Sequence, residues 1–135
     1  MIQEKDFLLR EMQRMTLLLK ELISKVTGLD SGNSSAGLTE IDRTLKNNLD
    51  ISIKEIIDLS ENEFQEKILT IDENYLEKLS ELMFELIKKY NQKFNFDKNE
   101  LIKKNIIIIE TLNKKSNTYS LQRMNMKNTL LNTLK

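Results

Sequence analysis

The chain contains no cysteine, histidine, proline or tryptophan among its 135 residues. Without cysteine it can form no disulfide, thiolate nucleophile or zinc–thiolate site. Without histidine it lacks the commonest metal ligand and the side chain best matched to proton transfer near neutral pH. Any chemistry would rest on Asp, Glu, Lys, Ser or Tyr alone. The composition therefore predicts a protein that is not an enzyme and that binds no metal or cofactor.

An excess of either charge is also missing, and so are long apolar runs. The 21 basic residues match the 21 acidic ones, so no net field attracts nucleic acid or an anionic membrane. Uninterrupted apolar runs such as residues 106–109 fall far short of the roughly 20 residues that span a bilayer. Charged residues also interrupt the first dozen positions, where a secretory signal needs an apolar core. We therefore expect a cytoplasmic protein that makes no membrane contact.

The residues that are present favour helices throughout. Three pairs have capping-box spacing, in which a side chain and a carboxylate satisfy amides at a helix start: Ser52 with Glu55, Ser60 with Glu63, and Asp97 with Glu100. The four isoleucines at 106–109 would also suit a buried strand, but a cap precedes them and no second strand exists to pair with them. We predict an all-α fold. The expected helices cover residues 3–27, 40–46, 53–58, 61–69, 73–91, 98–115 and the segment from a cap at Ser116 or Thr118 to about Leu134.

The first helix carries an apolar stripe. Its members recur at spacings of 4, 3, 4, 3 and 4, which places them on one helix face. They are Leu8, Met12, Met15, Leu19, Leu22 and Val26. Leu9, Leu18 and Ile23 widen the stripe, and Leu17 points away from it. Such a face needs a protein partner, either within the chain or on a second copy. We predict that these six residues mediate oligomerisation and that the protein is a homodimer.

A change of composition divides the chain into three parts. All three glycines and three serines lie in residues 28–37, which is typical of a flexible linker. The segment lacks the Gly-Lys-Ser/Thr end of a phosphate-binding loop. We therefore predict an N-terminal amphipathic helix at 1–27, a linker at 28–37 and a helical bundle at 38–135. Within the bundle, we expect Leu121, Met124, Leu131 and Leu134 of the last helix to point inward.

Charge is segregated along the bundle. Residues 38–81 hold five basic and twelve acidic side chains, whereas residues 82–135 hold eleven basic and four acidic ones. A basic surface is therefore possible on the C-terminal hairpin, at Lys88, Lys89, Lys93, Lys103, Lys104, Lys114 and Lys115. Lysines beside stacking aromatics can hold single-stranded nucleic acid. The acidic segment argues against this role, because it would repel phosphates or neutralise the lysines within the fold.

Other carboxylates recur every four residues on the expected helix at 73–91. Glu73, Glu77, Glu81 and Glu85 have the spacing of ligands on one helix face. The Glu-x-x-His pairing of a di-iron bundle is missing, and so is the glycine-containing loop of a calcium site. Lysines alternate with these glutamates, as on a solvated helix face. We therefore expect no metal there.

Several segments also resemble a family of short uncharacterised bacterial proteins. The resemblance lies in the opening MIQEKDFLLR, in LLLKELI at 17–23, in LDISIKEI at 49–56 and in SLQR at 120–123. It implies a cytoplasmic helical protein with an amphipathic N-terminal helix and a single hairpin like a tetratricopeptide repeat, and it implies no chemical activity. We therefore predict a non-enzymatic protein–protein interaction module that self-associates through its first helix, with the hairpin available to another protein. The alternative is a small nucleic acid-binding protein that uses the basic hairpin.

Overall fold

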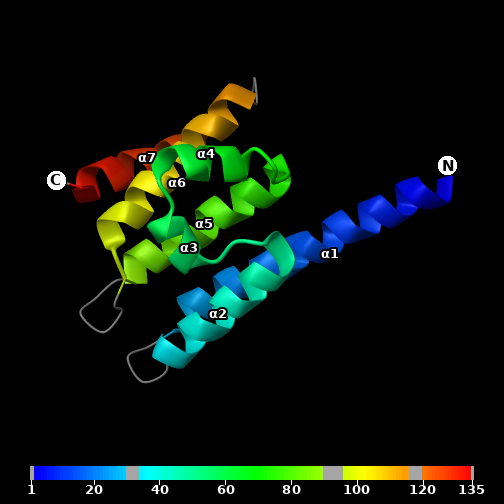
Figure 1. Cartoon of the computed structure of the whole chain (residues 1–135), viewed down its shortest axis with the longest axis horizontal. Helices are drawn as coiled ribbons and strands as arrows, with labels where there is room; N and C mark the ends of the chain where they lie inside the picture. The colour runs from blue at the N-terminus through cyan, green and yellow to red at the C-terminus, as the bar shows by residue number, and fades with distance from the viewer. Residues whose placement is uncertain (1, 30–33, 90–95, 116–119, 135) are drawn as a thin grey trace.

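The computed structural model describes residues 2–29, 34–89, 96–115 and 120–134. These residues form helices and turns and contain no strand, which confirms the all-α fold. The helices, in chain order in Figure 1, are α1 (Ile2–Thr27), α2 (Ser34–Leu49), α3 (Ile53–Asp58), α4 (Glu61–Ile68), α5 (Glu73–Lys89), α6 (Lys98–Lys115) and α7 (Leu121–Leu134).

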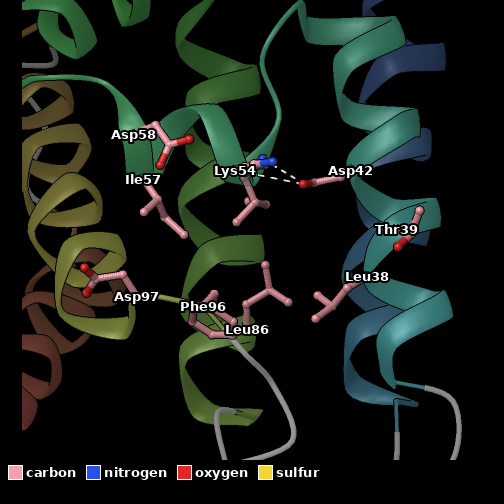
Figure 2. A pocket seen from close by; sticks show the side chains of 10 residues that line it. Leu38, Thr39, Asp42, Lys54, Ile57, Asp58, Leu86, Phe96 and Asp97 are labelled. Atoms are coloured by element: carbon pink, nitrogen blue, oxygen red, sulfur yellow. Dashed lines mark hydrogen bonds between the residues drawn. The ribbon is translucent and has the colours of Figure 1, made fainter.

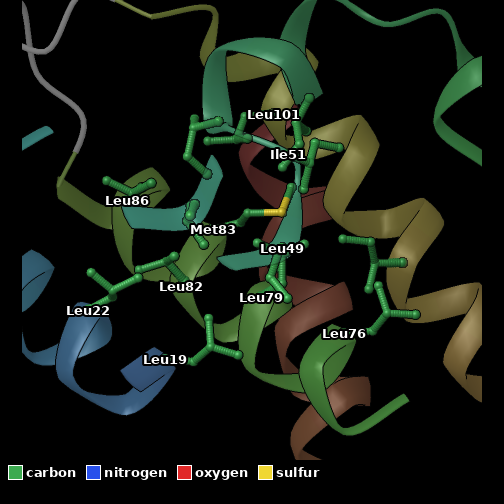
Figure 3. Close-up of a cluster of buried hydrophobic side chains, with 14 of the residues drawn as sticks. Leu19, Leu22, Leu49, Ile51, Leu76, Leu79, Leu82, Met83, Leu86 and Leu101 are labelled. Carbon is green, nitrogen blue, oxygen red and sulfur yellow. The ribbon is translucent and has the colours of Figure 1, made fainter. Parts of the chain in front are cut away.

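Helix α5 lies at the centre of the fold. It packs against α1 on one side and against α6 on the other, and α2 runs antiparallel beside α1 (Figure 1). The short helices α3 and α4 cover α6, and α7 returns along it. The apolar faces of these elements meet in one core, part of which is shown in Figure 3. Its fully buried members include Leu19, Leu76, Leu79, Leu82, Met83, Leu86 and Leu101.

The starts of α3, α4 and α6 follow the predicted caps. Ser52 Oγ accepts a hydrogen bond from the amide of Glu55 at 3.1 Å, and the carboxylate of Glu55 accepts one from the amide of Ser52 at 3.2 Å. Ser60 and Glu63 make the same reciprocal pair at 3.2 and 3.1 Å. Asp97 accepts from the amide of Glu100 at 3.1 Å, so it caps α6. Each cap satisfies amides that a helix start would otherwise leave without a partner.

The segment predicted as a linker is structured at both ends. Leu29 follows the end of α1 and is buried, and α2 begins at Ser34 although we expected this helix from residue 40. Gly37 faces Leu29 so closely that a Cβ there would lie 2.3 Å from Leu29 Cδ2. Glycine therefore allows α1 and α2 to approach each other at this turn. Residues 30–33 lie outside the described part of the chain. Because α1 and the bundle share one core, α1 does not stand apart as a separate unit.

Helix α7 presents a different face to the core from the predicted one. Leu121, Met124 and Leu131 are exposed, so the inward assignment of these three residues is wrong. The inward residues are instead Arg123, Met126 and Leu130, with Leu134 partly buried at the end of the helix.

The reason for this rotation lies outside α7. The guanidinium of Arg123 is buried, where it forms an ion pair with Glu77 of α5 and donates to Asn113 Oδ1 of α6 at 2.9 Å. Burying an arginine is tolerable only with such partners, and their positions fix which face of α7 turns inward. The predicted caps Ser116 and Thr118 lie outside the described residues. Ser120 caps the helix by accepting from the amide of Arg123 at 3.2 Å.

A buried polar pair joins α5 to α6. Ser80 Oγ donates to Asn105 Oδ1 at 2.6 Å, and Asn105 Nδ2 donates to the Ser80 carbonyl at 3.2 Å. Both residues are buried, and through these two hydrogen bonds each residue satisfies polar groups of the other within the apolar core. Because serine is small and asparagine can both donate and accept, this contact also fixes the register of the hairpin.

Candidate functional site

Helix α1 divides into a buried part and an exposed part. Met15, Leu19, Leu22 and Val26 of the predicted stripe are buried within the single chain, in the core that α1 shares with α5. Met12 is partly buried, and Leu8 is 62% exposed. In Figure 1 the N-terminal end of α1 extends beyond the other helices. The stripe thus finds its partner inside the monomer over most of its length, and only its beginning remains open to a second molecule.

The exposed part of α1 is unusually apolar. Phe7, Leu8, Leu9 and Leu17 are each between 56% and 62% exposed, and every described side chain from Lys5 to Arg10 is exposed. Leu8 continues the buried face past the end of the core, whereas Leu9 and Leu17 lie on another side of the helix. Leu17 was predicted to point away from the stripe, and it does. We call these four side chains the exposed α1 set.

A groove runs beside this set. Its volume is about 780 Å³, and it lies between α1 and α5, with Gln122 of α7 at its edge. Leu9, Met12, Gln13, Thr16, Leu17 and Lys20 form the α1 wall, and Asn74, Glu77, Lys78 and Glu81 form the α5 wall. The α5 wall is electrically balanced within the chain, because Lys78 lies 3.3 Å from Glu81 and Glu77 pairs with Arg123. The groove therefore combines a wall of mixed apolar and polar side chains on α1 with a polar wall on α5 whose charges are already paired.

A second pocket, of about 680 Å³, opens between α2, α3 and the start of α6 (Figure 2). Leu38, Ile57, Leu86 and Phe96 give it an apolar lining, and Asp42, Asp58 and Asp97 add carboxylates. Such a mixture of apolar surface and a few polar groups is common in ligand sites.

Two of these carboxylates already serve the fold. Asp42 accepts from the amide of Ile53 at 2.8 Å and from that of Lys54 at 3.3 Å, so it caps α3 from α2 (Figure 2). Burial raises the pKa of Asp42 above its ordinary value, although the two amides oppose this shift. Asp97 caps α6, as described above. Asp42 and Asp97 therefore act as helix caps in this pocket and do not form an acid–base pair.

The predicted basic surface is divided. Lys104 is fully buried, so it does not belong to a surface. Lys88 and Lys89 end α5 near the start of α6, whereas Lys114 and Lys115 end α6, about 25 Å further along that helix at 1.5 Å per residue. Lys88 also pairs with Glu85 at 3.0 Å. Lys103 is exposed between the two ends, and Lys93 lies outside the described residues.

Among the residues that the structure describes, no three acidic side chains gather as a metal-binding group. None of the described helices is long and apolar enough to cross a membrane.

The prediction that Leu9 widens the stripe is wrong, because Leu9 is 56% exposed and lies with Leu17 on another face of α1. Sequence reasoning missed this second face. Its apolar signal is weak, because only Leu9 and Leu17 are apolar in the series Asp6, Leu9, Gln13, Leu17 and Lys20, which recurs at spacings of 3, 4, 4 and 3. The stronger stripe on the other side of the helix concealed it. Comparisons of this chain with protein-family models, with curated proteins and with solved structures found no match.

Proposed function

We propose that this protein is a non-enzymatic helical interaction module that self-associates through the exposed part of α1. The observation that supports the proposal is the exposed α1 set, which remains uncovered on a helix whose other described apolar side chains are buried or partly buried.

The hydrophobic effect favours covering these apolar side chains with another protein surface. Burying a leucine side chain contributes about 1.5–3 kcal/mol, so Leu9 and Leu17, which lie on one side of each α1 in two copies, give a substantial driving force even after ordering costs. The first turns of α1 also lack support from the body of the chain, since the described side chains from Lys5 to Arg10 are all exposed. The apolar side chains of these turns therefore stay in water unless another surface packs against them. A second copy would supply that surface.

The test compares the molar mass of the full chain with that of two variants by size-exclusion chromatography with light scattering. We expect the wild-type protein to be dimeric at micromolar concentration. Leu17→Glu, which places a charge in the exposed α1 set, should yield a monomer with unchanged helical content. Leu69→Glu is the matched control, because Leu69 of the α4–α5 turn is 60% exposed and distant in sequence from α1. This variant should remain dimeric.

A wild-type protein that stays monomeric up to about 100 μM would overturn the proposal. Equal loss of dimer in both variants would also count against it, because a general effect of added charge would then explain the result. Circular dichroism of each variant separates loss of association from loss of folding.

A further inference from the structure

We propose that the partner of α1 is the α1 helix of a second copy, which lies antiparallel in the groove between α1 and α5, with the two-fold axis passing beside Gln13. This inference rests on the proposed self-association and specifies its geometry.

One face of α1 is available to a second helix. Asp6, Leu9, Gln13, Leu17 and Lys20 are all exposed, and at 3.6 residues per turn they lie within a strip about 80° wide. We call this the outer strip. Met15, Leu19 and Leu22 occupy the side of the helix that is buried in the core. The outer strip is therefore free to meet another helix without disturbing the monomer.

Two-fold symmetry decides which residues of the two α1 helices face each other. In a two-fold contact between antiparallel helices, the residue numbers of every facing pair add up to the same value. With the axis at Gln13 that sum is 26. Leu9 then meets Leu17 of the partner subunit, and Asp6 meets Lys20 of the partner subunit. By symmetry each pair occurs twice. Apolar residues thus face apolar residues, and each acid faces a base.

The parallel orientation would bring like charges together. In a parallel pair in register, each residue of the outer strip meets its own copy. Two Asp6 carboxylates would then face each other at one end, and two Lys20 ammonium groups at the other. Like charges in contact oppose association, whereas opposite charges favour it and fix the orientation. The charge pattern of the strip therefore selects the antiparallel arrangement.

The groove supports the same placement. Leu9, Gln13, Leu17 and Lys20 of the outer strip belong to its α1 wall. The opposite wall on α5 holds Lys78 and Glu81 in an ion pair, so it presents little net charge against an approaching helix. A helix laid along this groove would contact both walls and cover the leucines of the strip. It would also bring the unsupported first turns of each α1 against the body of the other copy.

Charge exchange tests the orientation. Asp6→Lys and Lys20→Asp should each raise the dimer dissociation constant about tenfold, because each change replaces two attractions by two repulsions. The double variant Asp6→Lys/Lys20→Asp restores opposite charges and should return to within about threefold of wild type. Sedimentation equilibrium at low ionic strength, where screening is weakest, gives the three constants. The antiparallel register would be overturned if the double variant dimerised as weakly as expected from adding the free-energy costs of the two single changes.

Cysteine cross-linking gives an independent answer, and the chain has no cysteine of its own to interfere. Gln13→Cys should form a disulfide-linked dimer, because the two copies meet at the axis. Asp6→Cys alone should not, because its two copies would lie about 21 Å apart along the helices, at 1.5 Å per residue. A mixture of Asp6→Cys and Lys20→Cys proteins should form the mixed disulfide.

The outcomes separate the two proposals. A monomeric wild-type protein overturns both the self-association and its geometry. A dimeric wild-type protein in which Asp6→Cys links to itself overturns the antiparallel geometry alone and leaves self-association standing. A dimer in which none of the three cysteines forms a link places the contact away from the outer strip and overturns the geometry as well.

Discussion

A single buried lysine holds the junction between α3 and α4 together. Lys104 of α6 is fully buried, and its Nζ donates to the carbonyl of Ile56 at 2.9 Å and also to the carbonyl of Leu59. In a continuous helix these carbonyls would accept from the amides of Ser60 and Glu63. The capping box of α4 uses both amides, so the lysine takes their place. The ring of Phe64, 5.5 Å from the ammonium, adds a favourable cation–π contact.

Replacing this lysine should therefore be costly. We expect Lys104→Met to lower the free energy of unfolding by about 2 kcal/mol, because it leaves two buried carbonyls without donors. Methionine keeps the length of the side chain and suits a helix, so packing and propensity change little. The matched control is Lys103→Met at the exposed neighbouring position, which should change stability by less than about 0.5 kcal/mol. Urea denaturation measures both. Equal effects at the two positions would show that the two hydrogen bonds contribute nothing.

Two of the capping carboxylates should contribute to stability with opposite dependences on pH. Burial raises the pKa of Asp42 above 3.8, so the folded state holds that proton more tightly than the unfolded state does. Its contribution to stability is therefore present at low pH and is lost as the pH rises from about 3.8 through the raised value. The amide of Ser60 lowers the pKa of Glu63 below 4.5, so the contribution of Glu63 is present above 4.5 and is lost as the pH falls through the lowered value.

Two amide variants isolate these contributions. From pH 3 to pH 7 the stability of wild type minus that of Asp42→Asn should decrease. The stability of wild type minus that of Glu63→Gln should increase over the same range. Thermal or urea unfolding at several pH values gives both differences. Two curves with the same slope would contradict the prediction for at least one of these residues.

At the scale of elements, α7 has apolar residues on two faces, and the structure selects one. Adjacent leucines test that choice with identical chemistry: Leu130 is 0% exposed and Leu131 is 42% exposed. We expect Leu130→Ala to lower the free energy of unfolding by about 3 kcal/mol, through lost burial and the cavity left behind. Leu131→Ala should cost less than about 1 kcal/mol. The order of the two urea midpoints checks the assignment, and a reversed order would restore the face that the sequence predicted.

Local signals explain which elements were predictable. The capping boxes at Ser52 and Ser60 involve residues three positions apart, so a short stretch of sequence contains the whole interaction. The face of α7 depends instead on Glu77, which lies 46 positions from Arg123. Apolar spacing within the helix does not encode that contact. The start of α2 similarly depends on Leu29 meeting Gly37 across the turn.

The candidate surface was predictable in the same partial way. The spacing of Leu8 to Val26 correctly predicted an apolar helix face. It did not indicate where the core would stop covering that face, because this depends on how far α5 and its neighbours extend alongside α1. The exposure of Leu8, the first residue of the stripe, follows from that geometry.

At the scale of the whole molecule, α1 links folding to association. Its later turns belong to the core of one chain, and its outer strip is the proposed contact with another. Self-association should therefore stabilise the fold by mass action, and the melting temperature should depend on protein concentration. Where the dimer predominates, the free monomer concentration rises as the square root of the total. A hundredfold increase then adds about 1.4 kcal/mol per chain, or roughly 4 °C for a domain of this size.

Two substitutions only two residues apart distinguish the two roles of α1. Leu19→Glu places a charge in the fully buried core and should unfold the chain at every concentration. Leu17→Glu should leave the chain folded, with a melting temperature equal to that of the dilute wild-type protein and independent of concentration. Differential scanning calorimetry from about 5 to 500 μM measures these dependences. If wild type and Leu17→Glu melted at the same temperature across that range, the exposed α1 set would not couple association to stability. If Leu19→Glu remained folded and only dissociated, α1 would not be part of the monomer core.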